Sequence, residues 1–133
     1  MNEETREKVE RLYEQGNLGY AYIFPKGSTY WNEKLMFQLI PEDIANVVMS
    51  NAYTAEKVVV TDMADNLVCN SMFGGFLDQC PNQNLCKEIV SVLMPIQMGD
   101  AESKEVMYAT NEEMNEYLMA EDEMVTMAEM SMM

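Results

Sequence analysis

Two-residue periods in the sequence, set off by glycine and proline, constrain the fold of this chain more than any other feature. In residues 18–24, LGYAYIF, bulky side chains alternate with smaller ones, and residues 33–40, EKLMFQLI, place Leu35, Phe37 and Leu39 on one side. A period of two is typical of a β-strand, because successive side chains point to opposite faces of a sheet. Strands that follow each other closely, with turn residues between them, favour antiparallel pairing.

Helix signals follow each pair of strands. Pro41 and Pro81 suit the first turn of a helix, because that turn does not need the N–H that proline lacks. The order of elements predicts one α+β domain across residues 1–133, with an antiparallel sheet of four to five strands, helices on one face, and an acidic, Met-rich C-terminal helix. The expected helices are 3–15, 41–51, 81–94 and 110–133, and the expected strands are 18–24, 33–40, 56–62, 67–79 (broken at Gly74-Gly75) and 104–109.

The helical periodicity also predicts which side chains face the core. We expect a β-hairpin turn at Asp65-Asn66 between the third and fourth strands. We expect Pro95 to bend or end the third helix. The apolar positions expected to share one helix face are Val9, Leu12 and Tyr13; Ile44, Val47 and Val48, expected as a buried stripe; and Leu85, Cys86, Ile89 and Leu93.

The charge of the chain is strongly unbalanced. With 23 acidic and 8 basic residues the formal net charge is -15, whereas the solubility of a small domain needs a magnitude of only about 2–8. Such a surplus repels nucleic acids and anionic membrane surfaces, so we expect direct binding to neither. Two interpretations stay open: a basic protein partner, or a surface that serves solubility alone.

Several function classes lose support from the composition. The chain contains no histidine, which excludes Ser–His and Cys–His nucleophile pairs, imidazole bases and zinc sites with histidine ligands. The segments FGGF (73–76) and DMADN (62–66) lack the remaining residues of a phosphate-binding loop and of a calcium loop. We therefore expect a non-enzymatic protein without a metal or another cofactor.

The sequence favours a cytoplasmic location. The N-terminal residues, MNEETREKVERLYEQGN, are charged and lack the apolar core of a secretory signal. No apolar run approaches the roughly 18 residues that a membrane span requires. Cys69, Cys80 and Cys86 are odd in number and form no recognisable disulfide framework, which indicates reduced thiols.

Cys80 supplies the main alternative to a non-enzymatic function. It stands directly before Pro81, at the expected N-terminus of a helix, where the helix dipole stabilises a thiolate. A reactive Cys80, with Cys86 as a resolving thiol, would make the protein a small thiol-dependent enzyme or a redox protein. Asp78 opposes ionisation, and a buried, unreactive side chain is the competing interpretation.

The C-terminal quarter concentrates the surplus charge. Residues 100–133 contain ten acidic residues, one basic residue and eight of the fifteen methionines. Thr110 and Glu113 form a capping box, which predicts a helix from about Glu112. One stripe of that helix consists of Tyr117, Ala120, Met124 and Met127.

Three interpretations of this methionine-rich stripe stay open. It packs in the protein's own core, it docks on a partner or on a second copy of the chain, or its thioethers bind Cu(I). No thiol or imidazole accompanies the methionines, so we expect no metal site. The residues expected to bind a partner are Glu112, Glu113, Glu116, Glu121, Asp122, Glu123, Met124 and Met127.

Carboxylates spaced along a folded helix resemble the charge pattern of duplex DNA, which carries one negative charge per about 1.7 Å. We therefore expect the protein to bind, and so to occupy or inhibit, a basic partner protein that itself binds nucleic acid. In its small size, acidity and lack of histidine the chain is similar to the antirestriction and anti-CRISPR proteins of phages and mobile elements, with which it shares no motif. A structural homodimer held by the Met-rich helix is a further alternative.

Aromatic side chains form a second candidate surface. Tyr20, Tyr22, Tyr30 and Trp31 lie close together in the sequence, and tyrosine and tryptophan are favoured at binding hot spots. Ordinary packing on a sheet is the competing interpretation of the same residues.

Overall fold

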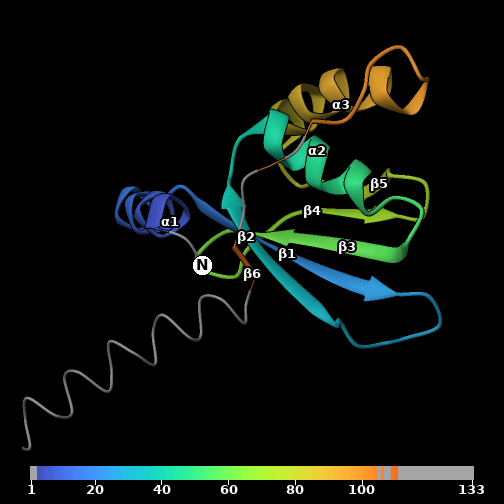
Figure 1. Ribbon diagram of the computed structural model, residues 1–133. Helices are drawn as coiled ribbons and strands as arrows, with labels where there is room; N and C mark the ends of the chain where they lie inside the picture. The colour runs from blue at the N-terminus through green and yellow to red at the C-terminus, as the bar shows by residue number, and fades with distance from the viewer. Residues whose placement is uncertain (1–2, 105, 107–108, 111–133) are drawn as a thin grey trace, which may run out of the picture.

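The computed structural model describes residues 3–104, 106, 109 and 110 of the chain (Figure 1). These residues form an antiparallel sheet with three helices, which confirms the α+β class. The elements are α1 (Glu3–Gln15), β1 (Leu18–Pro25), β2 (Glu33–Gln38), α2 (Pro41–Ser50), β3 (Ala55–Thr61), β4 (Leu67–Met72), β5 (Phe76–Gln79), α3 (Gln83–Gln97) and β6 (Ala109–Thr110).

All neighbouring strands pair antiparallel, in the order β5-β4-β3-β1-β2-β6. Five strands have four residues or more, and β6 adds two residues at one edge, where Ala109 lies opposite Met36 and Thr110 opposite Leu35. The strand expected at 104–109 was therefore predicted too early. Of the described residues in that range, only Ala109 belongs to a strand.

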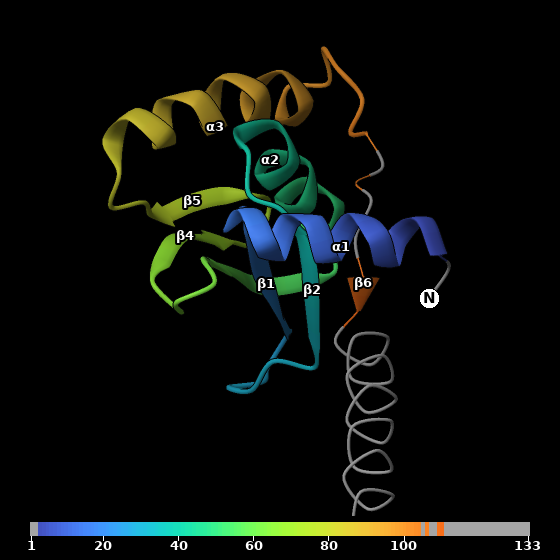
Figure 2. The ribbon, with the colours of Figure 1, turned by 90° about the vertical axis from the view of Figure 1, so that its left-hand side faces the viewer.

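Helices α2 and α3 lie side by side over one face of the sheet, which we term the inner face (Figures 1 and 2). Their predicted apolar positions Ile44, Val47, Val48, Ile89 and Leu93 are buried, while Leu85 and Cys86 are half-buried at the margin. These helices pack on strand residues that alternate along the sequence. The strand residues of this core are Ala21, Ile23, Leu35, Phe37, Ala55, Val58, Val60 and Cys69.

Helix α1 lies across one end of the strands (Figure 2) and contacts side chains of the opposite face. Val9 and Leu12 of α1 form a small second cluster with Leu18 and Met36. Tyr13, which the periodicity places on the same helix face, does not join this cluster, and its side chain is 61% exposed. Successive residues point about 100° apart around a helix, and the contact of α1 with the sheet is too narrow to include the residue after Leu12.

The predicted hairpin turn between β3 and β4 is confirmed. Asp65 adopts a left-handed conformation with φ of 64°. The Asp62 carboxylate accepts hydrogen bonds of 2.9 Å from the backbone N–H groups of both Ala64 and Asn66. These bonds lower the pKa of Asp62, since they stabilise its charged form. The segment DMADN is therefore an Asp-stabilised turn.

Helix α3 differs from its prediction at both ends. It begins at Gln83, two residues after Pro81, because the Asn82 side chain caps it by accepting a bond from the Leu85 N–H. Pro95 does not end it immediately, and the helix continues to Gln97. After the helix ends, the Pro95 carbonyl accepts hydrogen bonds from the N–H groups of Asp100 and Ala101.

A buried asparagine fixes the segment that leads from α3 to β6. Asn46 of α2 is 2% exposed, and its side-chain oxygen accepts a 2.6 Å hydrogen bond from the Lys104 N–H. Its amide nitrogen donates to the Glu42 carbonyl at 2.8 Å. The Lys104 ammonium pairs with the Glu42 carboxylate at 3.1 Å, and Val106 joins the core. These contacts direct the chain toward the β2 edge.

Candidate interaction surface on the open face of the sheet

Most of the sheet face opposite α2 and α3 is not covered by any helix of the described residues (Figure 1). Helix α1 covers only the end near Leu18 and Met36. We term the remaining surface the open face. Its residues are Tyr22, Phe24, Trp31, Lys34, Lys57, Val59, Asn70 and Met72.

The strand register arranges these side chains in two rows across the sheet. In the first row Lys34 lies opposite Tyr22, Tyr22 opposite Val59, and Val59 opposite Asn70. The second row is formed by Phe24, Lys57 and Met72. Each row residue alternates along its strand with an inner-face residue, so the strand period that builds the core also builds this surface.

Lysines lie over the aromatic rings of the open face. The Lys34 ammonium is 4.3 Å from the ring centre of Tyr20 and 5.2 Å from that of Tyr22. The Lys57 ammonium is 4.5 Å from the ring centre of Phe24. Cations within about 6 Å of a ring face are attracted by its quadrupole. Among the described residues no carboxylate lies within ion-pair distance of either lysine.

Trp31 and Asp65 border the tyrosine end of this surface. The Trp31 ring meets Tyr22 edge to face, with centres 5.4 Å apart and planes at 66°. The Tyr22 hydroxyl donates a 3.3 Å hydrogen bond to the Asp65 carboxylate. Trp31 remains 43% exposed, so it presents a rigid aromatic surface to solvent, as binding hot spots do.

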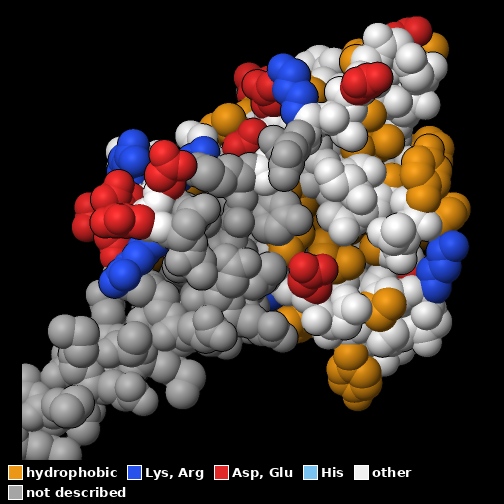
Figure 3. Space-filling view, viewed as in Figure 1, with side chains coloured by type: hydrophobic (Ala, Val, Ile, Leu, Met, Phe, Trp, Pro, Cys, Tyr) orange, Lys and Arg blue, Asp and Glu red, His pale blue; other side chains and the backbone are white. Residues whose placement is uncertain are grey.

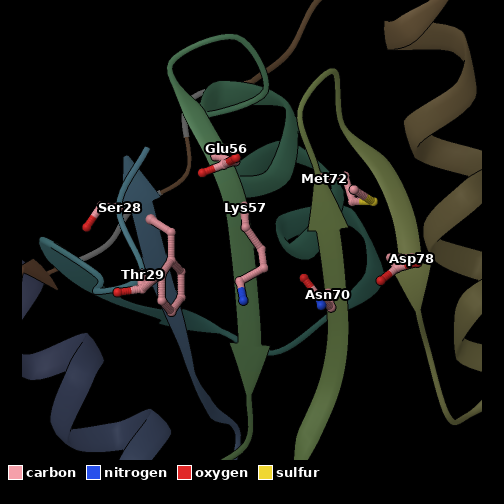
Figure 4. A pocket seen from close by; sticks show the side chains of 8 residues that line it. Ser28, Thr29, Glu56, Lys57, Asn70, Met72 and Asp78 are labelled. Carbon is pink, nitrogen blue, oxygen red and sulfur yellow. The ribbon is translucent and has the colours of Figure 1, made fainter. Parts of the chain in front are cut away.

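A hollow of about 340 Å³ lies beside the second row (Figure 4). Lys57 and Asn70 project into it from β3 and β4, with Asp78 of β5 on one side and Thr29 on the other. The Asn70 side-chain oxygen is buried and has no hydrogen-bond partner among the described residues. The hollow is mixed in charge and can accept both a donor and an anionic group.

Charged and hydrophobic side chains are unevenly distributed over the face shown in Figure 3. Many Asp, Glu, Lys and Arg side chains lie around α1, while hydrophobic side chains are more frequent on the side of the β4–β5 turn. The latter side includes Tyr53 and Phe73, whose rings meet edge to face at 6.0 Å. Tyr53, Phe76 and Met98 are 65%, 65% and 69% exposed.

The partner-binding residues predicted from the sequence lie outside the described residues. This holds for Glu112, Glu113, Glu116, Glu121, Asp122, Glu123, Met124 and Met127, and for the helix predicted there. Thr110, the predicted cap of that helix, lies in β6. An extended backbone is also the conformation that an N-cap residue adopts.

Cys80 does not occupy the position that its proposed reactivity needs. It precedes the Asn82 cap, so it is not in the first turn of α3. Burial and a hydrogen bond with Cys86 raise the pKa of Cys80 to about 11. A thiolate nucleophile needs the opposite shift. Cys69 on the inner face is more deeply buried, and burial raises its pKa to about 12.

The structure brings together part of the predicted aromatic patch. Tyr20, Tyr22 and Trp31 lie in one cluster with Lys34, while the Tyr30 side chain is 80% exposed. The sequence interpretation missed Phe24, Lys34 and Lys57. The positions of the two lysines follow from the β1–β2 and β1–β3 registers. Phe24 could have been predicted from the alternation in β1, because it continues the series Tyr20 and Tyr22 on one side of the strand.

Searches for related proteins and for metal or membrane features gave no assignment. Comparison of the chain with models of protein families, with curated proteins and with solved structures found no match. Within residues 3–104, 106, 109 and 110, no three His, Cys, Asp or Glu side chains are grouped so as to hold a metal ion. No helix in this part of the chain is long and apolar enough to cross a membrane.

Proposed function

We propose that the protein is a non-enzymatic interaction protein that binds a basic, nucleic-acid-binding protein and occupies its basic surface. One observation carries this proposal: the acidic surplus has few internal counter-charges. Fifteen acidic and all eight basic residues lie in residues 3–104. In that part of the chain two ion pairs form, Arg6–Glu10 at 4.0 Å and Lys104–Glu42 at 3.1 Å. Lys26, Lys34 and Lys57 lie over aromatic rings instead.

The residues after β6 add to the acidic surplus of the sequence. Residues 111–133 contain seven acidic residues and no basic residue. Neighbouring residues of a helix are about 1.5 Å apart along its axis, so seven carboxylates on a helix of this length would lie about 5 Å apart on average, a sparser row of negative charge than that of duplex DNA. The long-range attraction would raise the association rate and disfavour acidic competitors. We assign partner contact to Glu112, Glu113, Glu116, Glu121, Asp122, Glu123, Met124 and Met127.

The open face supports a protein partner over a small-molecule substrate. Tyr22 and Trp31 offer rigid aromatic contact area, and the carboxylates of Glu56, Asp65 and Asp78 are exposed around it. Arginine side chains of a basic protein can stack on such rings and pair with such carboxylates.

The proposal includes a cytoplasmic location, which is supported by the three free cysteines Cys69, Cys80 and Cys86.

Affinity capture from cell lysate at two salt concentrations tests the proposal. The full chain is the bait, and captured proteins are identified by mass spectrometry. We expect a basic nucleic-acid-binding protein that is retained at low salt, released by about 0.5 M salt, and displaced by added duplex DNA. A partner whose retention is unaffected by salt and by DNA would contradict the proposal.

Matched charge variants locate the contact. E112Q/E113Q/E116Q removes three carboxylates from the assigned region without changing side-chain size, and we expect it to weaken binding of the identified partner at least tenfold. E3Q/E4Q/E7Q removes the same charge from α1 and is expected to weaken it less than twofold. Equal effects of both variants would show that only net charge matters.

A further inference from the structure

We propose that Cys80 and Cys86 form a reversible disulfide within the folded chain, by exchange with a low-molecular-weight disulfide of the glutathione type. This modification site does not depend on the proposed function. It also differs from the thiol-dependent enzyme that the sequence left open, because it needs neither an activated thiolate nor a substrate. Three features support it: the way the start of α3 holds the two thiols, their access to solvent, and the burial of the third cysteine.

One backbone carbonyl brings the two cysteines together. The carbonyl oxygen of Asn82, the N-cap of α3, accepts a 2.9 Å hydrogen bond from the Cys86 N–H. The Cys80 thiol donates to the same oxygen at 3.7 Å. The Asn82 side chain accepts a 3.1 Å bond from the Leu85 N–H, which holds the first turn of the helix in shape. Both cysteines are therefore fixed against a single residue of the cap.

The two thiols are in contact with each other. The side chains of Cys80 and Cys86 form a hydrogen bond. A disulfide needs Cβ atoms about 3.5–4.5 Å apart, so thiols in hydrogen-bond contact have only a short distance to close. Cys80 lies between the end of β5 at Gln79 and the start of α3 at Gln83. Its backbone can therefore adjust without breaking either element.

The three cysteines of the chain differ in their access to reagents. Residues 81–84 are exposed, and Cys80 and Cys86 on either side of them are half-buried. Cys69 is 0% exposed on the inner face. Burial, and to a lesser extent the nearby Cys80 and Cys86, raise the pKa of Cys69 to about 12. Cys69 is thus excluded from exchange by its burial, which leaves Cys80 and Cys86 as the reacting pair.

Oxidation takes place in two exchange steps. Burial and the contact with Cys86 raise the pKa of Cys80 to about 11, so we place the first attack at Cys86. The Cys86 thiolate attacks one sulfur of the external disulfide, forms a mixed disulfide and releases one external thiolate, which takes up a proton. Cys80 then loses its proton to solvent, attacks the Cys86 sulfur and releases the second external thiolate. Two protein thiols become one disulfide, and the external disulfide becomes two thiols.

The disulfide would fix the edge strand β5. This strand has four residues and pairs with β4 at three positions, with an irregular register. Helix α3 is anchored in the core by Ile89 and Leu93. A covalent link between the end of β5 and α3 would hold the strand in place, together with Asp78 beside the hollow (Figure 4). Disulfides in a reducing compartment are transient, so the rigidity of this edge would follow the redox state.

Equilibration of the full chain with reduced and oxidised glutathione tests the disulfide directly. Acid stops the exchange, alkylation marks the remaining thiols, and intact and peptide mass spectrometry identify each pair. We expect a Cys80–Cys86 disulfide within one chain, with Cys69 alkylated only after denaturation. Because the fold holds the thiols together, the ratio of this disulfide to the dithiol should be about tenfold higher in native buffer than in concentrated guanidinium chloride. Equal ratios, disulfides between chains, or glutathione retained on either cysteine would overturn the inference.

Two variants of Asn82 test whether the cap positions the thiols. Asn82→Ala removes the side-chain bond to the Leu85 N–H and should lower the native-over-denatured preference for the disulfide about threefold, because the first turn of α3 frays. Asn82→Asp retains a capping oxygen and should keep the preference of the natural chain. Equal preferences in the two variants would contradict the role of the cap.

Hydrogen exchange tests the consequence for β5. Amides of β5 should exchange about threefold more slowly in the disulfide form than in the dithiol form, while amides of β1 change little. C80S/C86S treated with the same oxidant is the control and should show no change at β5. Exchange at β5 that is the same in both redox forms would refute the link between the disulfide and this edge of the sheet.

Discussion

The two faces of the sheet are built from alternate residues of the same strands but differ completely in chemistry. On β1, Ala21 and Ile23 enter the core under α2 and α3, whereas Tyr22 and Phe24 lie on the open face. The inner face is mainly aliphatic around Phe37 and is closed by helices. The open face is aromatic, and lysine side chains lie over its rings in place of helices. The lysine side chains cover part of each ring and keep their charged ends in water, so the rings are only half-buried. The rest of the aromatic area remains available for contact with another molecule.

The largest predicted difference between the faces concerns two phenylalanines. Phe37 is 1% exposed at the centre of the inner face, and Phe37→Ala is expected to lower the free energy of unfolding by about 3–5 kcal/mol. Phe24→Ala on the open face should cost about 1 kcal/mol, because less apolar area is lost from a half-buried position. Urea denaturation measures both. Equal losses would show that the open face is covered as completely as the inner face.

A smaller loss is expected from the buried asparagine on the inner side. Asn46→Ala leaves the Lys104 N–H without its 2.6 Å partner and should cost about 2 kcal/mol. Hydrogen exchange at Lys104 should accelerate strongly, while amides of the β3–β4 hairpin change little. A loss below about 0.5 kcal/mol would mean that the segment before β6 is held by other contacts.

The buried thiol of Cys69 on the inner face is expected to make the free energy of unfolding depend on pH. Burial raises the pKa of Cys69 from 9.0 to about 12, so above pH 9 the unfolded state loses a proton that the folded state retains. The stabilisation is therefore present below pH 9 and is lost as the pH rises toward 12. Between pH 8 and 10 the free energy of unfolding should fall by roughly 1 kcal/mol more than in Cys69→Ala. Identical slopes would contradict the burial of this thiol.

The smallest effect is expected at a lysine of the open face. Lys57→Ala removes the ammonium above Phe24 and should cost about 0.5–1 kcal/mol in a urea melt. Lys87→Ala on α3 serves as the control and should change stability by less. A cost above about 2 kcal/mol would indicate that Lys57 has an essential structural role, and the contrast between the faces would then be weaker than described.

The sequence predicted the elements well because their signals are local. Alternation identified β1 and β2, and Pro41 marked the start of α2 at the correct residue. Pro81 misled in α3, because the neighbouring Asn82 accepts a backbone hydrogen bond and so sets the helix start. Tyr13 was placed on the contact face of α1 because periodicity identifies the apolar side of a helix. Periodicity does not show how wide the surface is on which that side packs.

The open face was only partly predictable for a related reason. Tyr20, Tyr22 and Trp31 are neighbours in the sequence, so their clustering could be expected from composition. The contact of Lys57 with Phe24 depends on the pairing of β1 with β3, two strands separated in the chain by β2 and α2. No local pattern encodes that pairing, since it results from the way the two hairpins assemble under α2 and α3. The acidic partner-binding residues stay a prediction.

The short strand β6 has a consequence for the order of folding. Thr110 meets Leu35 although more than seventy residues separate them along the chain. Contacts between such distant segments carry a large loop-closure entropy and form slowly, whereas the β1–β2 and β3–β4 hairpins close early. Until β6 arrives, the outer edge of β2 has free backbone groups that can pair with a strand of another molecule. Pairing with β6 occupies that edge at Leu35 and Met36 and so shortens the part of it that another strand can reach.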